Sequence, residues 1–101
     1  MWLFVMFDLP VDTKAARKRY AKFRKLLLEE GFSMLQYSVY ARYNASEEFA
    51  DAIRRRVRQA LPPDGQVRVM AVTDRQFGKM EVFLGKTRTK PESAPTQLFL
   101  F

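Results

Sequence analysis

The sequence predicts an α+β domain in which one antiparallel sheet carries two helices on one face. An apolar run opens the chain, two stretches of helical periodicity follow it, and short runs of β-forming residues stand between and after them. The expected order is therefore strand, helix, strand, strand, helix, strand, which is the split βαβ arrangement. The 101 residues have room for one such domain.

The first strand is expected over residues 2–8. Every residue from Trp2 to Phe7 is apolar, which fits a central strand that is buried on both faces. Asp8 is the first charged residue, and Pro10 ends the strand soon afterwards because proline has no backbone N–H to donate. Asp8 therefore stands at the rim of a rigid strand, where a carboxylate is well placed to hold a metal ion.

Two helices are expected, over residues 14–30 and 44–61. Apolar residues recur at helical spacing in both and mark the faces that should be buried. These residues are Ala16, Tyr20, Phe23 and Leu27 in the first helix, and Phe49, Ile53, Val57 and Ala60 in the second. The candidate N-caps are Asp12 and Thr13 for the first helix, and Asn44 and Ser46 for the second.

The remaining segments are rich in β-forming residues and complete the sheet. Two short strands, or one bent strand with a break near Gln36-Tyr37, are expected within residues 32–43. Further strands are expected over 66–73, 80–84 and 97–101, with a polar connector over 86–95. The expected fold is ferredoxin-like, βαββαβ with an extra C-terminal strand. It divides into a domain over 1–85 and a flexible connector with C-terminal strand over 86–101.

The first strand should leave one apolar face of the sheet without a cover. Its two sets of side chains alternate between the faces and are both apolar until Asp8. One set packs under the helices, and the other forms a bare apolar patch unless something covers it. The simplest cover is a second copy of the chain in a two-fold dimer.

Composition narrows the chemistry and favours an anionic partner. The chain has no His and no Cys, so zinc sites, thiol chemistry and disulfides are absent, as in many cytoplasmic proteins. The net charge is +7, and the basic residues fall in two blocks without acids. The blocks are Lys14, Arg17, Lys18, Arg19, Lys22, Arg24 and Lys25, then Arg54, Arg55, Arg56 and Arg58. They are either solvated helix faces or a nucleic-acid surface, and two blocks favour nucleic acid over a membrane.

Asp8 admits two interpretations. A Mg²⁺ ion typically takes one or two carboxylates and keeps several waters. A two-fold dimer could supply the pair from one residue, and a metal held there could activate water or stabilise a leaving oxygen. Alternatively, Asp8 accepts backbone hydrogen bonds in the turn before Pro10. Tyr37, Tyr40 and Tyr43 could stack on nucleobases, although aromatic residues in a sheet are more often core.

Several motifs in order along the chain resemble one family. They are Phe7-Asp8-Leu9-Pro10, the basic Arg17-Lys18-Arg19, Gly31-Phe32, Gln36-Tyr37-Ser38-Val39-Tyr40, and Val72-Thr73-Asp74-Arg75-Gln76-Phe77. The chain is similar to the small CRISPR-associated spacer-acquisition proteins of the Cas-two family. The resemblance covers nearly the whole chain, and the strand-end Asp and the Gln-Tyr-Ser-Val-aromatic segment are its most specific parts.

The resemblance implies a ferredoxin-like homodimer in which Asp8 of each protomer shares a magnesium ion. It implies metal-dependent endonuclease activity on single-stranded RNA or double-stranded DNA, with Asp8 as catalytic and metal-binding residue. It also implies a scaffold that bridges dimers of the CRISPR integrase subunit and holds spacer DNA. Arg17 and Arg19 match a basic pattern of the family's first helix, and Lys18 lies between them. The alternative function is a basic ferredoxin-like RNA-binding module without catalytic activity.

Overall fold

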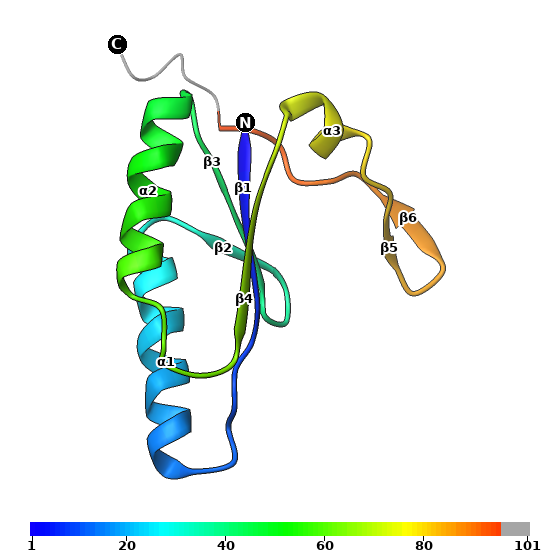
Figure 1. The fold of residues 1–101 in the computed structure, drawn as a ribbon. Helices are drawn as coiled ribbons and strands as arrows, with labels where there is room; N and C mark the ends of the chain where they lie inside the picture. Colours follow the sequence, from blue (N-terminus) through cyan, green and yellow to red (C-terminus); the bar gives the residue numbers. More distant parts are fainter. Residues whose placement is uncertain (96–101) are drawn as a thin grey trace.

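The fold is a four-stranded sheet with two helices on one face and a small helix and hairpin on the other. The computed structural model describes residues 1–95. In chain order the elements are β1 (Trp2–Asp8), α1 (Lys14–Glu29), β2 (Ser33–Gln36), β3 (Val39–Tyr43), α2 (Glu47–Gln59), β4 (Gln66–Val72), α3 (Asp74–Gly78), β5 (Val82–Leu84) and β6 (Thr87–Thr89). In Figure 1, α1 and α2 lie to one side of the sheet, and α3 and β5–β6 lie to the other.

The sheet has the order β2-β3-β1-β4, and the pairings of β1 with both neighbours and of β2 with β3 are antiparallel. Strand β1 is central, as its apolar sequence predicts. The break expected near Gln36-Tyr37 is confirmed, since β2 ends at Gln36 and β3 begins at Val39. The predicted α+β, ferredoxin-like architecture is confirmed.

The helix-covered face contains the main core. Leu3, Val5 and Phe7 of β1 point toward the helices and are buried. From α1 and α2 they meet four buried apolar side chains, Phe23, Leu27, Ile53 and Val57. Phe7 also makes an edge-to-face contact with Phe23, with ring centroids 5.3 Å apart.

The helix caps decide between the predicted candidates. Thr13 caps α1 by accepting a hydrogen bond from the Ala16 N–H, and Ser46 caps α2 by accepting one from the Phe49 N–H. Asn44 is buried instead, and its amide donates to the carbonyl of Arg42.

The prediction that Phe49 belongs to the buried stripe of α2 is wrong. Its side chain is 45% exposed, and the Arg42 guanidinium lies 4.7 Å from its ring centroid. Arg42 reaches this position because it donates to the Glu30 carbonyl at the C-terminal end of α1. The buried stripe of α2 is Ala50, Ile53 and Val57, and Phe49 lies beside this stripe with Arg42 packed on its ring.

The opposite face of the sheet, which we call the open face, is covered at one end only. Phe77 of α3 stacks on Trp2, with ring centroids 3.9 Å apart and planes 8° apart. Beside it, Phe4, Leu35 and Met80 are partly buried. The cover that the sequence required thus comes in part from the chain's own segment after β4. At the other end of this face Asp8 and Arg68 are exposed, and on the edge strand Met70 is 47% exposed.

The segment after β4 differs from the prediction in two respects. Residues 80–84 were expected to give one strand, and 86–95 a connector. Instead, β5 pairs with β6 as a separate two-stranded sheet, so Thr87–Thr89 within the expected connector is a strand. The turn between them holds Gly85 at φ 63°, a conformation that glycine adopts without strain. The strand expected over 97–101 lies outside the described residues.

Candidate metal centre and nucleic-acid interface

Asp8 lies at the end of β1, opposite Gln66 of β4, and its side chain is exposed. Within residues 1–95 its carboxylate takes part in no ion pair and accepts no side-chain or backbone hydrogen bond. The alternative in which Asp8 accepts backbone hydrogen bonds before Pro10 is therefore not observed. The carboxylate is free to bind a cation from solution.

The backbone around Asp8 is fixed from two sides. The Phe7 N–H donates to the Ser38 carbonyl at 3.1 Å, which ties the end of β1 to the β2–β3 turn. On the other side Gly65, at φ 86°, lies so close that a Cβ atom there would be 2.8 Å from the Asp8 carbonyl oxygen. The Asp8 carboxylate thus projects from a backbone segment that is held in place, which suits a binding site whose geometry must stay constant.

A cavity of about 220 Å³ borders Asp8. Its lining residues come from β1, the β2–β3 turn and the start of β4: Met6, Phe7, Asp8, Tyr37, Ser38, Val39, Gln66 and Arg68. The lining combines a carboxylate, a guanidinium, a hydroxyl and an exposed aromatic ring. The cavity therefore offers groups that bind cations, phosphates and nucleobases.

The residues present fit a magnesium ion only in part. Among the residues that the structure describes, there is no group of three or more Asp, Glu, His or Cys side chains that could hold a metal. One chain brings the single carboxylate of Asp8, which is within the one or two that Mg²⁺ commonly uses. A second carboxylate would have to come from another copy of the chain.

Helix α1 separates the two arginines of its basic motif. Arg17 and Arg19 are two residues apart, so their side chains leave the helix about 200° apart. Arg17 donates to the Val11 carbonyl at 3.0 Å, whereas Arg19 lies 3.5 Å from Asp64 in the loop before β4. Lys18 is exposed on the outer surface between them. None of the three lines the cavity beside Asp8.

The two basic blocks have different relations to their helices. In α2, Glu47 and Glu48 stand in the first turn and arginines in the last, which the helix dipole favours. Two arginines of α2 are also ion-paired, Arg54 with Asp51 and Arg56 with Glu30. The pKa of Arg56 is raised by its hydrogen bond to Glu30. The second block therefore has structural reasons to be basic.

The block on α1 is only partly explained in this way, because Arg19 pairs with Asp64 and Lys25 with Glu29, but the helix dipole does not favour it. Its first turn contains no acid and its last turn contains no base. Lys14, Arg17 and Lys18 stand near the positive end of the helix dipole, where cations are disfavoured. A charge distribution that works against the helix is expected where it serves an external anion, and this singles out α1 as the candidate nucleic-acid surface.

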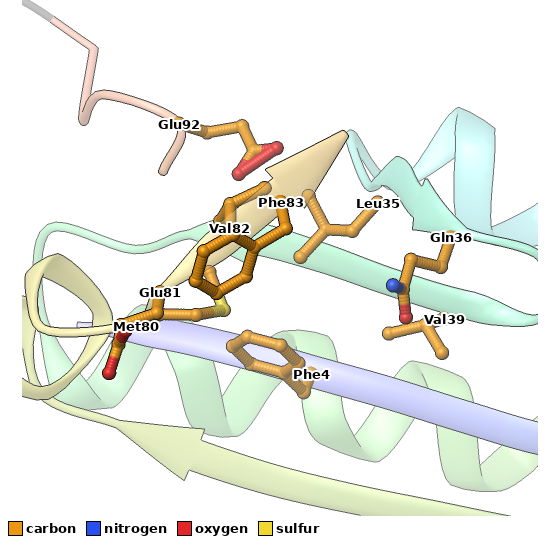
Figure 2. A pocket seen from close by; sticks show the side chains of 9 residues that line it. All are labelled: Phe4, Leu35, Gln36, Val39, Met80, Glu81, Val82, Phe83 and Glu92. Atoms are coloured by element: carbon orange, nitrogen blue, oxygen red, sulfur yellow. The ribbon is translucent and has the colours of Figure 1, made fainter. Parts of the chain in front are cut away.

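A larger cavity, of about 330 Å³, lies between the open face and the hairpin. In Figure 2, Phe4 of β1 and Leu35 of β2 face Val82 and Phe83 of β5 across it, with Glu92 at the rim. Its lining is mainly apolar and contains none of the residues predicted to form a site. We attribute it to incomplete packing of the hairpin on the sheet.

Comparisons with known proteins agree with this fold. Residues 1–80 match the model of the family described as CRISPR associated protein Cas2. The chain belongs to the Cas2 family. The resemblance noted in the sequence is thereby confirmed.

Relatives within the Cas2 family extend over the whole chain. A protein of Parvibaculum lavamentivorans named CRISPR-associated endoribonuclease Cas2 is 52% identical over 101 residues, all of both chains. One of the same name from Flavobacterium psychrophilum is 46% identical over all of this chain and 88% of its own. The crystal structure of Streptococcus pyogenes Cas2 at pH 6.5 superposes with a TM-score of 0.61 at 26% identity, covering 82% of this chain and 99% of its own.

The structure adds residues that the sequence did not connect with Asp8. Gln66 and Arg68 reach it through the pairing of β4 with β1, and Ser38 through the β2–β3 turn. The signal for Arg68 was its alternation with Val67 and Val69, which placed it on the face opposite those two. The partner strand of β4 and the register of the pairing, however, could not be known from the sequence.

No helix within residues 1–95 is long and apolar enough to cross a bilayer.

Proposed function

We propose that this Cas2-family protein acts in CRISPR adaptation as a homodimeric scaffold. The dimer holds double-stranded spacer DNA and bridges dimers of the integrase subunit. The observation that carries the proposal is the unpaired Asp8 at the rim of an open face that is only partly covered. A second copy facing this surface would bury apolar side chains and bring two Asp8 carboxylates together.

The open face has the composition of a dimer interface. Met6, Val39 and Met70 lie on it beyond the cover of α3, and all three are partly exposed to solvent. Met side chains adapt to a partner surface at low steric cost. A two-fold axis near the end of β1 would place equivalent residues opposite each other. Asp8 of each protomer would then supply the pair of carboxylates that one chain lacks.

A magnesium ion held by the two Asp8 carboxylates would supply a Lewis acid for a phosphate oxygen. Metal-dependent endonuclease activity on RNA or DNA is therefore a second activity proposed for the same dimer. It is supported by the name endoribonuclease that the relatives carry. In this proposal Asp8 holds the ion and is the catalytic residue.

Helix α1 would bind the DNA backbone. Lys18 is exposed, and Arg17 keeps guanidinium donors beyond the one used on Val11. Arg19 pairs with Asp64 at 3.5 Å, and both side chains are partly exposed. An exposed pair of this kind contributes at most about 1 kcal/mol, so a phosphate can replace Asp64. The three residues would bind phosphates on both flanks of the helix rather than at one point.

Spacer integration in vitro with the partner integrase tests the proposal. The samples are wild type, Asp8→Ala and the double variant Arg17→Glu/Arg19→Glu. We expect the double variant to lose integration, and Asp8→Ala to retain it while losing magnesium-dependent cleavage measured with and without EDTA. Loss of integration by a folded, dimeric Asp8→Ala would contradict the scaffold and make the metal site essential.

The matched control is Arg55→Glu/Arg58→Glu on α2. It changes the net charge by the same amount, and these two exposed arginines form no ion pair within residues 1–95. We expect this control to retain most of the integration activity. An equal loss in both double variants would show that binding follows net charge and not the surface of α1.

A further inference from the structure

A second groove, which we call the helix groove, lies on the helix-covered side of the sheet. It is a cavity of about 260 Å³ between the middle of α1 and the segment that follows α2. In Figure 1 these two helices lie on the side of the sheet away from α3 and the hairpin. The helix groove shares no lining residue with the cavity beside Asp8. A second copy that docks on the open face therefore leaves the helix groove accessible.

The floor and one wall of the helix groove are apolar. From α1 come Phe23, which is 2% exposed, and Leu26, which is partly buried and packs against the main core. The other wall contains Pro62 and Pro63, whose rings fix the backbone, and Leu61, which is 44% exposed. An apolar side chain that enters the groove meets a wall that is already ordered, so its binding costs little conformational entropy.

The rim of the helix groove is cationic. Arg19 and Lys22 line it, and no Asp or Glu does. Lys22 is exposed and forms no ion pair within residues 1–95. The Nε atom of Arg19 is buried and has no acceptor among the described residues, which is a costly state that an acceptor from a partner would relieve. The groove is thus complementary to a carboxylate that stands beside an apolar side chain.

The size and lining of the helix groove favour a protein segment over a nucleotide. Sites for small molecules commonly occupy about 300–1,000 Å³, which is more than this groove provides. Phe23 is the one aromatic residue of its lining and is buried, so no ring is exposed for a base to stack on. A single apolar side chain in a well-formed pocket is, by contrast, the usual anchor of a protein interface.

We propose that the helix groove is a docking site for the integrase subunit, which inserts an apolar side chain beside Leu61 and places an acidic residue near Lys22. The inference rests on the proposed function and deepens it by assigning the surface that the partner contacts. In a dimer formed through the open face, the two-fold axis places the two helix grooves on opposite outer surfaces. A bridge between two integrase dimers requires two such separate surfaces.

Binding of the purified integrase subunit to the full-length protein, measured by calorimetry without DNA, tests the helix groove. The variants are Leu61→Glu and Lys22→Glu. Arg19 stays unchanged because it also belongs to the proposed duplex surface on α1. We expect each variant to weaken integrase binding roughly tenfold or more, since each removes a central contact. Binding by Lys22→Glu should also depend less on salt than binding by the wild type.

Two control variants carry the same changes outside the helix groove. Leu28→Glu repeats the leucine substitution at a residue of α1 that is 42% exposed. Arg24→Glu changes the net charge as Lys22→Glu does, at an exposed position about 200° around the helix from Lys22. Neither residue lines the groove, and both controls should bind the integrase as the wild type does. Leu61→Ala introduces no charge and should show a smaller loss in the same direction, with an unchanged circular dichroism spectrum.

Three results would overturn the helix groove as the docking site. The first is integrase binding that is unchanged in both Leu61→Glu and Lys22→Glu, and the second is an equal loss in the two controls. The third is weakened binding of duplex DNA by Leu61→Ala, which would assign the groove to nucleic acid. If the wild type binds the integrase and the groove variants do so equally well, the groove is excluded and the scaffold stands. If the wild type itself does not bind the integrase, the scaffold is contradicted as well.

Discussion

The two faces of the sheet are built for different purposes from the same strands. On the helix-covered face, Leu3 and Val5 are fully buried under α1 and α2. On the open face, burial is confined to the end where Phe77 covers Trp2, and the other end carries exposed charge at Asp8 and Arg68. One face supplies stability, and the other leaves apolar and charged side chains exposed, which the proposed function uses.

The comparison shows that the chain leaves its sheet surface exposed at one particular end of the open face. The chain covers the Trp2 end of the open face with its own α3 and leaves the Asp8 end uncovered. A cover over Asp8 from the same chain would have hidden the carboxylate and the cavity beside it. The exposed end is therefore where a second copy has to bind for the proposed function.

The largest effect on stability is expected from the helix-covered face. Leu27→Ala removes a fully buried side chain, and we expect the free energy of unfolding to fall by about 2–5 kcal/mol. Leu28→Ala is the matched control, because Leu28 is the next residue of α1 and is 42% exposed. Urea denaturation followed by circular dichroism measures both, and the control should change by less than about 0.5 kcal/mol. Equal losses would mean that α1 is not docked as described.

A smaller loss is expected from the covered end of the open face. Phe77→Ala should lower the free energy of unfolding by about 2 kcal/mol, below the range for a closed core, because its cluster is small and borders solvent. It should also shift the emission of Trp2, the one tryptophan of the chain, to longer wavelength. Phe83→Ala removes an exposed ring and should leave the Trp2 emission unchanged. An unchanged Trp2 spectrum in Phe77→Ala would contradict the stacking of α3 on the sheet.

A still smaller loss of stability is expected at the end of β1, where Gly65 packs against the backbone of Asp8. Gly65→Ala places a Cβ atom against the Asp8 carbonyl at a positive φ, and we expect a cost of about 1–2 kcal/mol in unfolding. The variant should also weaken any function of Asp8, since the end of β1 must move. Gly78→Ala adds a Cβ atom to open space and should be neutral or slightly stabilising. Thermal unfolding of the two glycine variants tests this prediction. An unchanged stability of Gly65→Ala would show that the backbone at the end of β1 is not rigid.

The sequence predicted the elements that depend on long patterns. The apolar run of β1 and the periodicity of α1 and α2 were sufficient for the sheet and helices. It also placed Asp8 at the strand end. The opposite directions of Arg17 and Arg19 follow from the helical period alone.

What could not be predicted depends on contacts distant in sequence. Helix α3 was not predicted because it is a single short turn, although the spacing of Thr73 and Gln76, which form a capping box, could have indicated it. Phe49 lies outside the buried stripe and contacts Arg42, whose position depends on the end of α1. The Asp8 cavity required the register of β4, which sets Arg68 opposite Met6.

The central claim is that the uncovered end of the open face is the surface on which a second copy docks. Sedimentation equilibrium of wild type, Met70→Glu and Leu28→Glu tests it most directly. Met70 lies on the open face and Leu28 on α1, and their exposures are similar at 47% and 42%. We predict a dimer for wild type and Leu28→Glu, and a folded monomer for Met70→Glu. A monomeric wild type, or a Met70→Glu protein that remains dimeric, would contradict the claim.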